Sequence, residues 1–128
     1  MAVNAIQNYQ YHEGLVIKKI TFADYGTAVT VCKLPANSLI LEGGVVVTTA
    51  FNAGTTNVLD IGTSGDDDGF ATDLALGTIG RIMTDEMATS NDLYSASEVT
   101  IVATPAQTGT AATAGEGFVF IKFGHYLT

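Results

Sequence analysis

Three consecutive aspartates, Asp66 to Asp68, are the residues whose type and spacing could most readily do chemistry in this chain. They lie in the stretch LDIGTSGDDDGFATD (59–73), with Gly65 before them and Gly69 after them. Adjacent carboxylates between glycines can hold a calcium ion, can act as a general acid and base, or can form an exposed turn between two strands. The neighbouring residues discriminate among these three functions.

The calcium-binding function requires a ligand spacing that the sequence lacks. An EF-hand loop has oxygen ligands at its first, third and fifth positions, glycine at the sixth and glutamate at the twelfth. When Gly69 takes the sixth position, the twelfth is Ala75, which cannot bind a metal. We therefore expect a solvated loop between two strands and no metal ligand. A looser cation site built from Asp66, Asp68 and a carbonyl oxygen stays open.

The other reactive residue types also lack a catalytic arrangement. Acid–base catalysis by carboxyl groups needs an apolar pocket that raises the pKa of one of them, whereas aspartates between glycines predict a wet loop. The two histidines, His12 and His125, stand near the two ends of the chain, with no nucleophile motif and no zinc-binding spacing to the single cysteine, Cys32. We expect no catalytic residue, no metal and no cofactor. Cys32 is then a buried structural thiol, and His125 is an edge or core histidine.

Composition and charge exclude several classes of partner. Charged residues make up 14% of the 128 residues, well below the roughly 25% of an average globular protein. The net charge is −8 with only 5 Lys and Arg, which argues against nucleic acid because binding phosphates requires cations. No apolar run approaches the roughly 18 residues of a membrane helix, and the N-terminus has no signal-peptide pattern. We expect no nucleic-acid or membrane partner, and synthesis and folding in a cytoplasm.

The acids are unevenly placed along the chain. The region from Asp60 to Asp92 contains eight acids and a single cation, Arg81. One end or face should therefore be strongly negative, which favours solubility and could fit a basic partner.

Short apolar runs with two-residue alternation predict strands throughout. The expected strands are 15–22, 27–34, 45–51, 57–62, 98–104 and 117–127. The segment 85–98 is the only plausible helix, of a turn or two at most. Strands recurring about every 8–12 residues indicate a sandwich or jelly roll. The predicted fold class is all-β: an antiparallel β-sandwich, jelly-roll-like, with an extended N-terminal arm.

The sequence predicts two regions, an N-terminal arm over 1–13 and a single β-sandwich domain over 14–128. The arm is polar and lacks strand periodicity, and it contains Ile6, Tyr9 and Tyr11 as possible anchors on a partner. The alternative is that the tyrosines fold back on their own sandwich. The last strand is apolar on both faces, so Phe120 and Phe123 are further candidates for contact with another subunit or a partner.

The stretch LPANSLILEGGVVVTTAFNAGTTNVLDIGTSGDDDGFATDLAL (34–76) resembles small virion proteins of tailed bacteriophages, specifically capsid decoration, or cement, proteins. The resemblance extends in pattern over 15–126. It implies a non-enzymatic β-sandwich that is made in the bacterial host cytoplasm and binds the outer surface of the capsid. There it would clamp and stabilise neighbouring subunits of the major capsid protein. The five residues named above would then be capsid or subunit contacts.

A homotrimer is the expected assembly, with a dimer as second choice. Sparse charge leaves neutral surface for subunit packing, and the strand 45–51 has no charge to protect it if it is an edge. The resemblance to cement proteins favours three copies, because capsids have three-fold junctions. The alternative function is a tail or fibre module that recognises a carbohydrate or a receptor. The absence of tryptophan argues against a sugar-binding platform.

Overall fold

Strands are the main element of this computed structural model, which describes residues 11–126. In chain order they are β1 (Tyr11–Thr21), β2 (Val29–Leu34), β3 (Ser38–Thr49), β4 (Thr56–Thr63), β5 (Asp66–Ala75), β6 (Gly80–Met83), β7 (Tyr94–Ser95), β8 (Val99–Thr108) and β9 (Glu116–Tyr126). A single 3-10 turn, η2 (Phe22–Asp24), follows β1. Between residues 11 and 126 no helix is long and apolar enough to cross a membrane.

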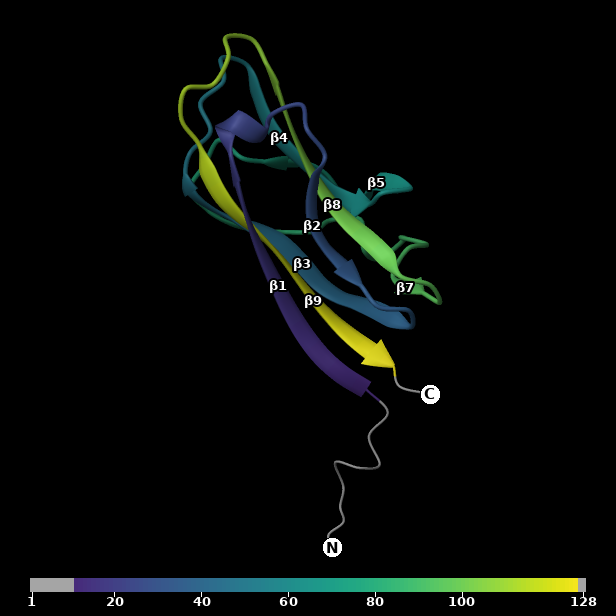
Figure 1. Cartoon of the computed structure of the whole chain (residues 1–128). Coiled ribbons are helices and arrows are strands. Elements are labelled where there is room, and N and C mark those ends of the chain that lie inside the picture. Colours follow the sequence, from purple (N-terminus) through teal and green to yellow (C-terminus); the bar gives the residue numbers. More distant parts are fainter. Residues whose placement is uncertain (1–10, 127–128) are drawn as a thin grey trace, which may run out of the picture.

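The strands form two packed antiparallel sheets, seen as two layers in Figure 1. Sheet A has the order β1-β9-β3-β6, with β7 paired to the start of β3; sheet B has the order β2-β8-β4-β5. The chain passes from one sheet to the other between β1 and β2, β2 and β3, β3 and β4, β5 and β6, β7 and β8, and β8 and β9. This order of two four-stranded sheets, with β7 as an addition, is that of a jelly roll. The predicted all-β, jelly-roll-like sandwich is confirmed.

The core lies between the two sheets and consists of the inward residues of each strand. Leu59 and Ile61 of β4 are fully buried while Asp60 between them is only half-buried, as the alternation predicts. Val45 and Val47 of β3 and Ile121 of β9 supply the facing layer. Full burial of one such side chain contributes about 1.5–3 kcal/mol, so this layer is the main source of stability.

The segment 85–98 contains no helix, so that prediction is wrong. Its residues form a turn in which the amide of Thr89 donates to the carbonyl of Glu86 at 3.2 Å, then a loop and the short strand β7. The amide of Asp92 donates to the hydroxyl of Ser90 at 3.1 Å. Side chains of this kind compete with the helical hydrogen bonds for backbone donors, which explains the outcome.

The start of β1 falls inside the predicted arm. Residues 11–13 pair with the end of β9, beginning with Tyr11 opposite Tyr126. Residues 1–10, with Ile6 and Tyr9, lie outside the described part of the chain. The division into an arm and one domain therefore stays a prediction.

The strand orders change the expectation about sheet edges. β1 pairs only with β9 and is an edge, and its Lys18 and Lys19 are exposed. The uncharged strand β3, in contrast, is interior, because Val45 and Val46 pair with β9 on one side and β6 on the other. The condition stated for 45–51, that it is an edge, is therefore not met, because the order within sheet A is set by pairing with β9 some 70 residues later.

Candidate interaction surface

The three aspartates stand at the start of β5. A short turn at Ser64 and Gly65 joins β4 to β5, and the hydroxyl of Thr63 accepts from the amide of Asp66 at 3.1 Å. Asp66 to Asp68 are exposed. The expected solvated loop is thus shortened to this turn, and the carboxylates belong to the exposed end of a strand.

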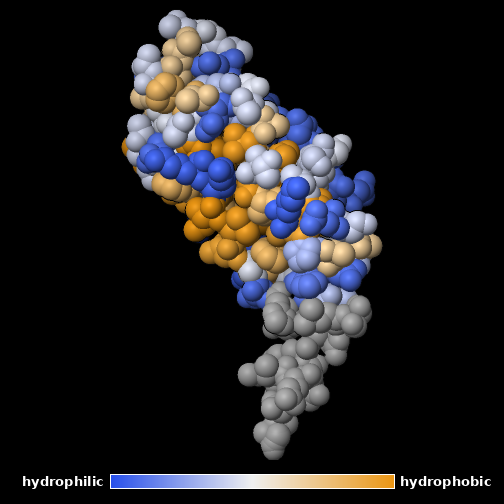
Figure 2. All heavy atoms as spheres, viewed as in Figure 1, coloured by the Kyte–Doolittle hydropathy of each residue, from blue (hydrophilic) through white to orange (hydrophobic). Residues whose placement is uncertain are grey.

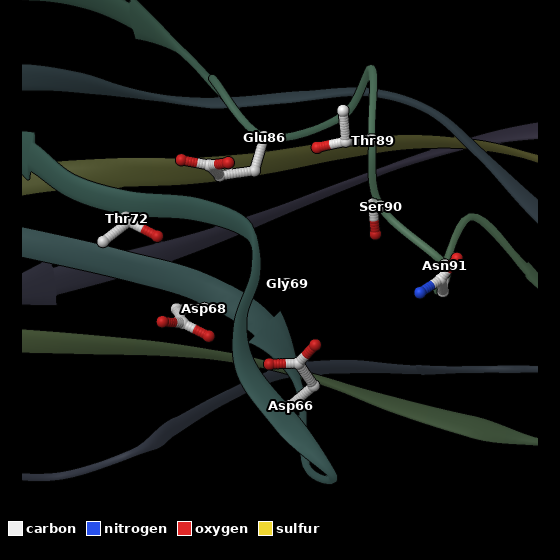
Figure 3. Close-up of a pocket in the computed structure, with 8 residues that line it drawn as sticks. All are labelled: Asp66, Asp68, Gly69, Thr72, Glu86, Thr89, Ser90 and Asn91. Atoms are coloured by element: carbon white, nitrogen blue, oxygen red, sulfur yellow. The ribbon is translucent and has the colours of Figure 1, made fainter.

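An open polar hollow of about 280 Å³ lies beside the aspartates (Figure 3). Side chains of β5 form one side of it, and side chains of the loop after β6 form the other. The lining residues are Asp66, Asp68, Gly69, Thr72, Glu86, Thr89, Ser90 and Asn91. The loop is held to β5 by the amide of Glu86, which donates to the carbonyl of Phe70 at 3.0 Å.

Two carboxylates lie close to Gly69. A Cβ atom there would lie 2.8 Å from Oδ2 of Asp92 and 3.0 Å from Oδ2 of Asp66. Both acids therefore lie against the same glycine, one from the loop and one from β5. Even so, among residues 11–126 no three His, Cys, Asp or Glu side chains gather closely enough to hold a metal ion.

Asp60, on the neighbouring strand β4, is the carboxyl group with a raised pKa. Burial raises its pKa first, and the negative charges of Asp73, Asp68 and Asp67 raise it further. The amide of Asp73 opposes this by donating to Oδ1 of Asp60 at 2.8 Å. The effect of these acids is to make one end of sheet B strongly negative.

Cys32 and the two histidines lie away from this end of sheet B. Cys32 is half-buried against the core, and burial raises the pKa of its thiol. His125 lies on the interior strand β9 and is half-buried. The β1–β9 register places His12 opposite His125, a proximity that their sequence separation did not predict.

The predicted contact residues Phe120 and Phe123 point to opposite faces of sheet A. The Phe120 ring covers Gly44 on the outer face, since a Cβ added to Gly44 would lie 2.9 Å from its Cζ. The Phe123 ring covers Gly14 and packs against the core cluster. The contact role of both stays a prediction, but they cannot belong to one flat surface.

The outer face of sheet A presents more apolar side chains than a solvated sheet face normally has. Leu15 and Ile17 of β1 are 62% and 60% exposed. Phe120 stands opposite Ile17 across the β1–β9 pair, and Leu39 and Leu41 of β3 are exposed as well. Figure 2 shows apolar residues gathered where β1, β9 and β3 lie in the same view.

We call the set of Leu15, Ile17, Leu39, Leu41 and Phe120 the apolar face. Phe120 is the only one of the five that the sequence predicted as a contact residue, and the other four were missed. The available signal was the run LVIKKI, which is apolar at both parities of the strand.

The charges on the outer face of sheet A nearly balance. Nζ of Lys19 lies 2.8 Å from Oε2 of Glu116, and Lys122 stands opposite Glu42 in the β9–β3 register. Hydrogen bonds from Lys19 and then from Thr48 hold the pKa of Glu116 below its ordinary value. The face is therefore apolar and close to neutral on a chain whose net charge is −8.

Comparison with known proteins identifies the fold but no sequence family. No protein-family model and no curated protein sequence matches the chain. Three solved structures match it in fold at 14–17% identity.

A chain of the cyanophage Pam1 capsid asymmetric unit has a TM-score of 0.68 at 16% identity, over 94% of this chain and 89% of that one. A chain of the acidic stable capsid of Helicobacter pylori bacteriophage KHP30 has a TM-score of 0.66 at 14% identity, over 90% and 91% of the two chains. A chain of the capsid of Ralstonia phage GP4 has a TM-score of 0.59 at 17% identity, over 88% and 85%. Because the coverage is near-complete in both directions, the matched chains are about as long as this one.

Proposed function

We propose that this chain is a non-enzymatic structural protein of a tailed-phage virion. The observation that carries the proposal is the near-complete, two-way fold match to three chains from phage capsid structures. A fragment match would be expected if the jelly roll were only a common module inside a larger protein. The match over whole chains of similar length instead supports a small separate subunit of a capsid.

Within the capsid, the proposed role is that of a decoration, or cement, protein. It would bind the outer surface of the major capsid protein and stabilise the shell, as a homotrimer at three-fold junctions. The resemblance of residues 34–76 to cement proteins supports this role, and so does a sparsely charged surface that can pack closely on a partner. A dimer at two-fold positions is the second choice.

A rebinding experiment tests the role directly. Empty shells of the encoding phage, assembled from the major capsid protein alone, are mixed with the purified chain and sedimented. The chain should sediment with the shells at a fixed stoichiometry, appear on the outside in a reconstruction, and raise the temperature at which shells rupture. A chain that stays in the supernatant and instead binds on a glycan array would support a tail or fibre module and overturn the cement role.

A further inference from the structure

We infer that the apolar face of sheet A is the surface through which copies of this chain pack against one another. The inference deepens the proposed function, since it assigns the subunit contact of the proposed trimer to Leu15, Ile17, Leu39, Leu41 and Phe120. The inference is tested on the isolated chain, so self-association through this face can be disproved while binding to shells is confirmed. Binding to shells can equally be disproved while self-association is confirmed.

The first argument is the position of the apolar side chains relative to the core. The inner side of sheet A already packs on sheet B through Val16, Ile20 and Ile121. Leu15 and Ile17 alternate with the inward residues of β1, so they stand on the outer side of the sheet. There the described chain covers less than half of each residue. The solvated face of an antiparallel sheet normally has polar residues at these alternate positions. Apolar residues at 15 and 17 are therefore typical of a surface that a partner covers.

The second argument is the size of the face. β1 and β9 have 11 residues each and β3 has 12, which gives three strands about 37 Å long and a sheet about 15 Å wide. The resulting footprint of about 550 Å² covers the whole outer side of these three strands, charged residues included, and protruding side chains enlarge its accessible surface. This approaches the about 800 Å² that each partner contributes to a standard specific interface.

The third argument is charge, and it favours a second copy as the partner. Every copy has a net charge of −8, and like charges facing each other across an interface oppose association. The acids from Asp60 to Asp92 belong mainly to sheet B and the loop after β6. On sheet A the Lys19–Glu116 pair and the opposed Lys122 and Glu42 balance. The electrostatic repulsion between two copies is therefore smallest when they meet through sheet A.

The geometry allows closed assemblies of two kinds. Three copies with this face toward a three-fold axis bury it around that axis, and two copies stacked face to face bury it in a dimer. Near one end of the face, an open hollow lined by Glu13, Gly14, Leu15 and Lys122 can accept a protruding side chain of the neighbouring copy. Either assembly leaves the acidic end of sheet B free for another partner.

The test measures the oligomeric state of the free full-length chain with a lysine placed on the face. Ile17→Lys is the central variant because Ile17 is exposed in the subunit, so the lysine does not disturb the core. Ile17→Val is the conservative variant. Thr30→Lys is the matched control, since Thr30 is an exposed strand residue of β2 in the other sheet.

Light scattering and sedimentation should give the wild type, Ile17→Val and Thr30→Lys a mass of two or three times the 13.3 kDa subunit. Ile17→Lys should raise the dissociation constant by at least about tenfold, with the circular dichroism spectrum of a folded sandwich. A monomeric wild type, or an Ile17→Lys variant that stays assembled, would overturn the inference.

Two further results would also overturn it by identifying another occupant. If the wild type is monomeric and Ile17→Lys abolishes sedimentation with shells, the face binds the major capsid protein. If removal of residues 1–10 converts a monomer into an oligomer, the chain's own N-terminal segment covers the face.

Discussion

Tyr25 connects the turn after β1 to the start of β4 through one hydrogen bond. Its hydroxyl donates to Oδ1 of Asn57 at 2.7 Å, and the same oxygen accepts from the amide of Ala53 at 2.8 Å. The Tyr25 ring meets Phe51 edge-on, with the ring centroids 5.7 Å apart. Burial raises the pKa of Tyr25 to about 12, so the neutral hydroxyl belongs to the folded state.

This arrangement makes alkaline stability depend on Tyr25. The folded pKa lies above the value of about 10 for an unfolded tyrosine. The stability that this group contributes is therefore fully present below about pH 10 and is lost as the pH rises toward about 12. We expect Tyr25→Phe to lower the free energy of unfolding by about 1 kcal/mol near neutral pH, because the hydrogen bond is lost while the ring stays.

Urea unfolding at steps between neutral pH and about pH 12 measures this dependence. The difference between wild type and Tyr25→Phe should shrink in the alkaline range, because the Tyr25 hydroxyl of the unfolded wild type ionises there while the folded one is still neutral. Tyr94→Phe is the control, since Tyr94 is exposed and its hydroxyl donates to Asn37 at the surface. A difference that is constant with pH would show that Tyr25 is not the responsible group.

Lysine substitutions at Phe120 and at Phe123 should have opposite effects on the folding of the subunit. Phe123→Lys places a charge against the core over Gly14, and we expect it to unfold the subunit or to lower its melting temperature steeply. Phe120→Lys places the charge on the outer face, so the subunit should remain folded and its self-association should weaken.

Thermal melting and light scattering on both variants separate these effects. Equal loss of stability in the two variants would show that Phe120 also supports the subunit core. Val46→Lys, on the same outer side of β3 opposite Phe118, is a useful comparison for the cost of a lysine on this face.

At the scale of the elements, the aspartates of the β4–β5 hairpin do not form a set of metal ligands with any other residues between 11 and 126. We expect thermal melts with excess calcium and with chelator to give the same melting temperature within error. A ligand that binds only the native state must stabilise it by mass action. A rise of many degrees with calcium would therefore reveal a tight site at Asp66 and Asp68 and contradict this expectation.

The N-terminal segment and β1 can be separated by two truncations. Removal of residues 1–10 should leave the sandwich folded and weaken binding to shells, if this segment contacts the capsid. Removal of residues 1–13 should also lower the melting temperature, because it deletes the β1–β9 pairs from Tyr11 to Glu13. A truncation of 1–10 that unfolds the chain would show that the segment is part of the core.

Alternation predicted the strands whose inward residues are clearly apolar. Leu59, Ile61 and the valines of β3 have this pattern, so β3 and β4 could be located, with boundaries that differ by up to several residues. β5 was missed because it begins with three aspartates and its pairing with β4 shifts register twice. β6 has only four residues, with two of them glycine and arginine, and therefore shows no usable period.

The candidate surface depends on long-range pairing and was less predictable. Ile17 could be placed on a strand from its neighbours, but its side of the sheet follows from pairing with Phe120, about a hundred residues later. The pairing of His12 with His125 has the same origin. A single sequence supplies local period and turn chemistry, whereas such pairings follow from the packing of the whole chain.

For the molecule as a whole, sheet A is completed by β9, the last of the described strands in sequence order. β9 lies between β1 and β3 and pairs with both along most of its length. β1 has no other strand partner in residues 11–126, so sheet A cannot form completely until β9 is available. Folding should therefore be slow, as expected when contacts are distant in sequence.

The pairing of Tyr11 with Tyr126 brings the first and last described residues together at one pole of the molecule, as Figure 1 shows. A fluorescent label attached at Tyr11 or at Tyr126 would thus crowd the same pole. The loop between β8 and β9 lies at the opposite pole in Figure 1, and Ala111 and Thr113 within it are exposed. An epitope inserted there would leave the terminal pole unobstructed, which makes this loop the better site for labelling the protein on an intact particle.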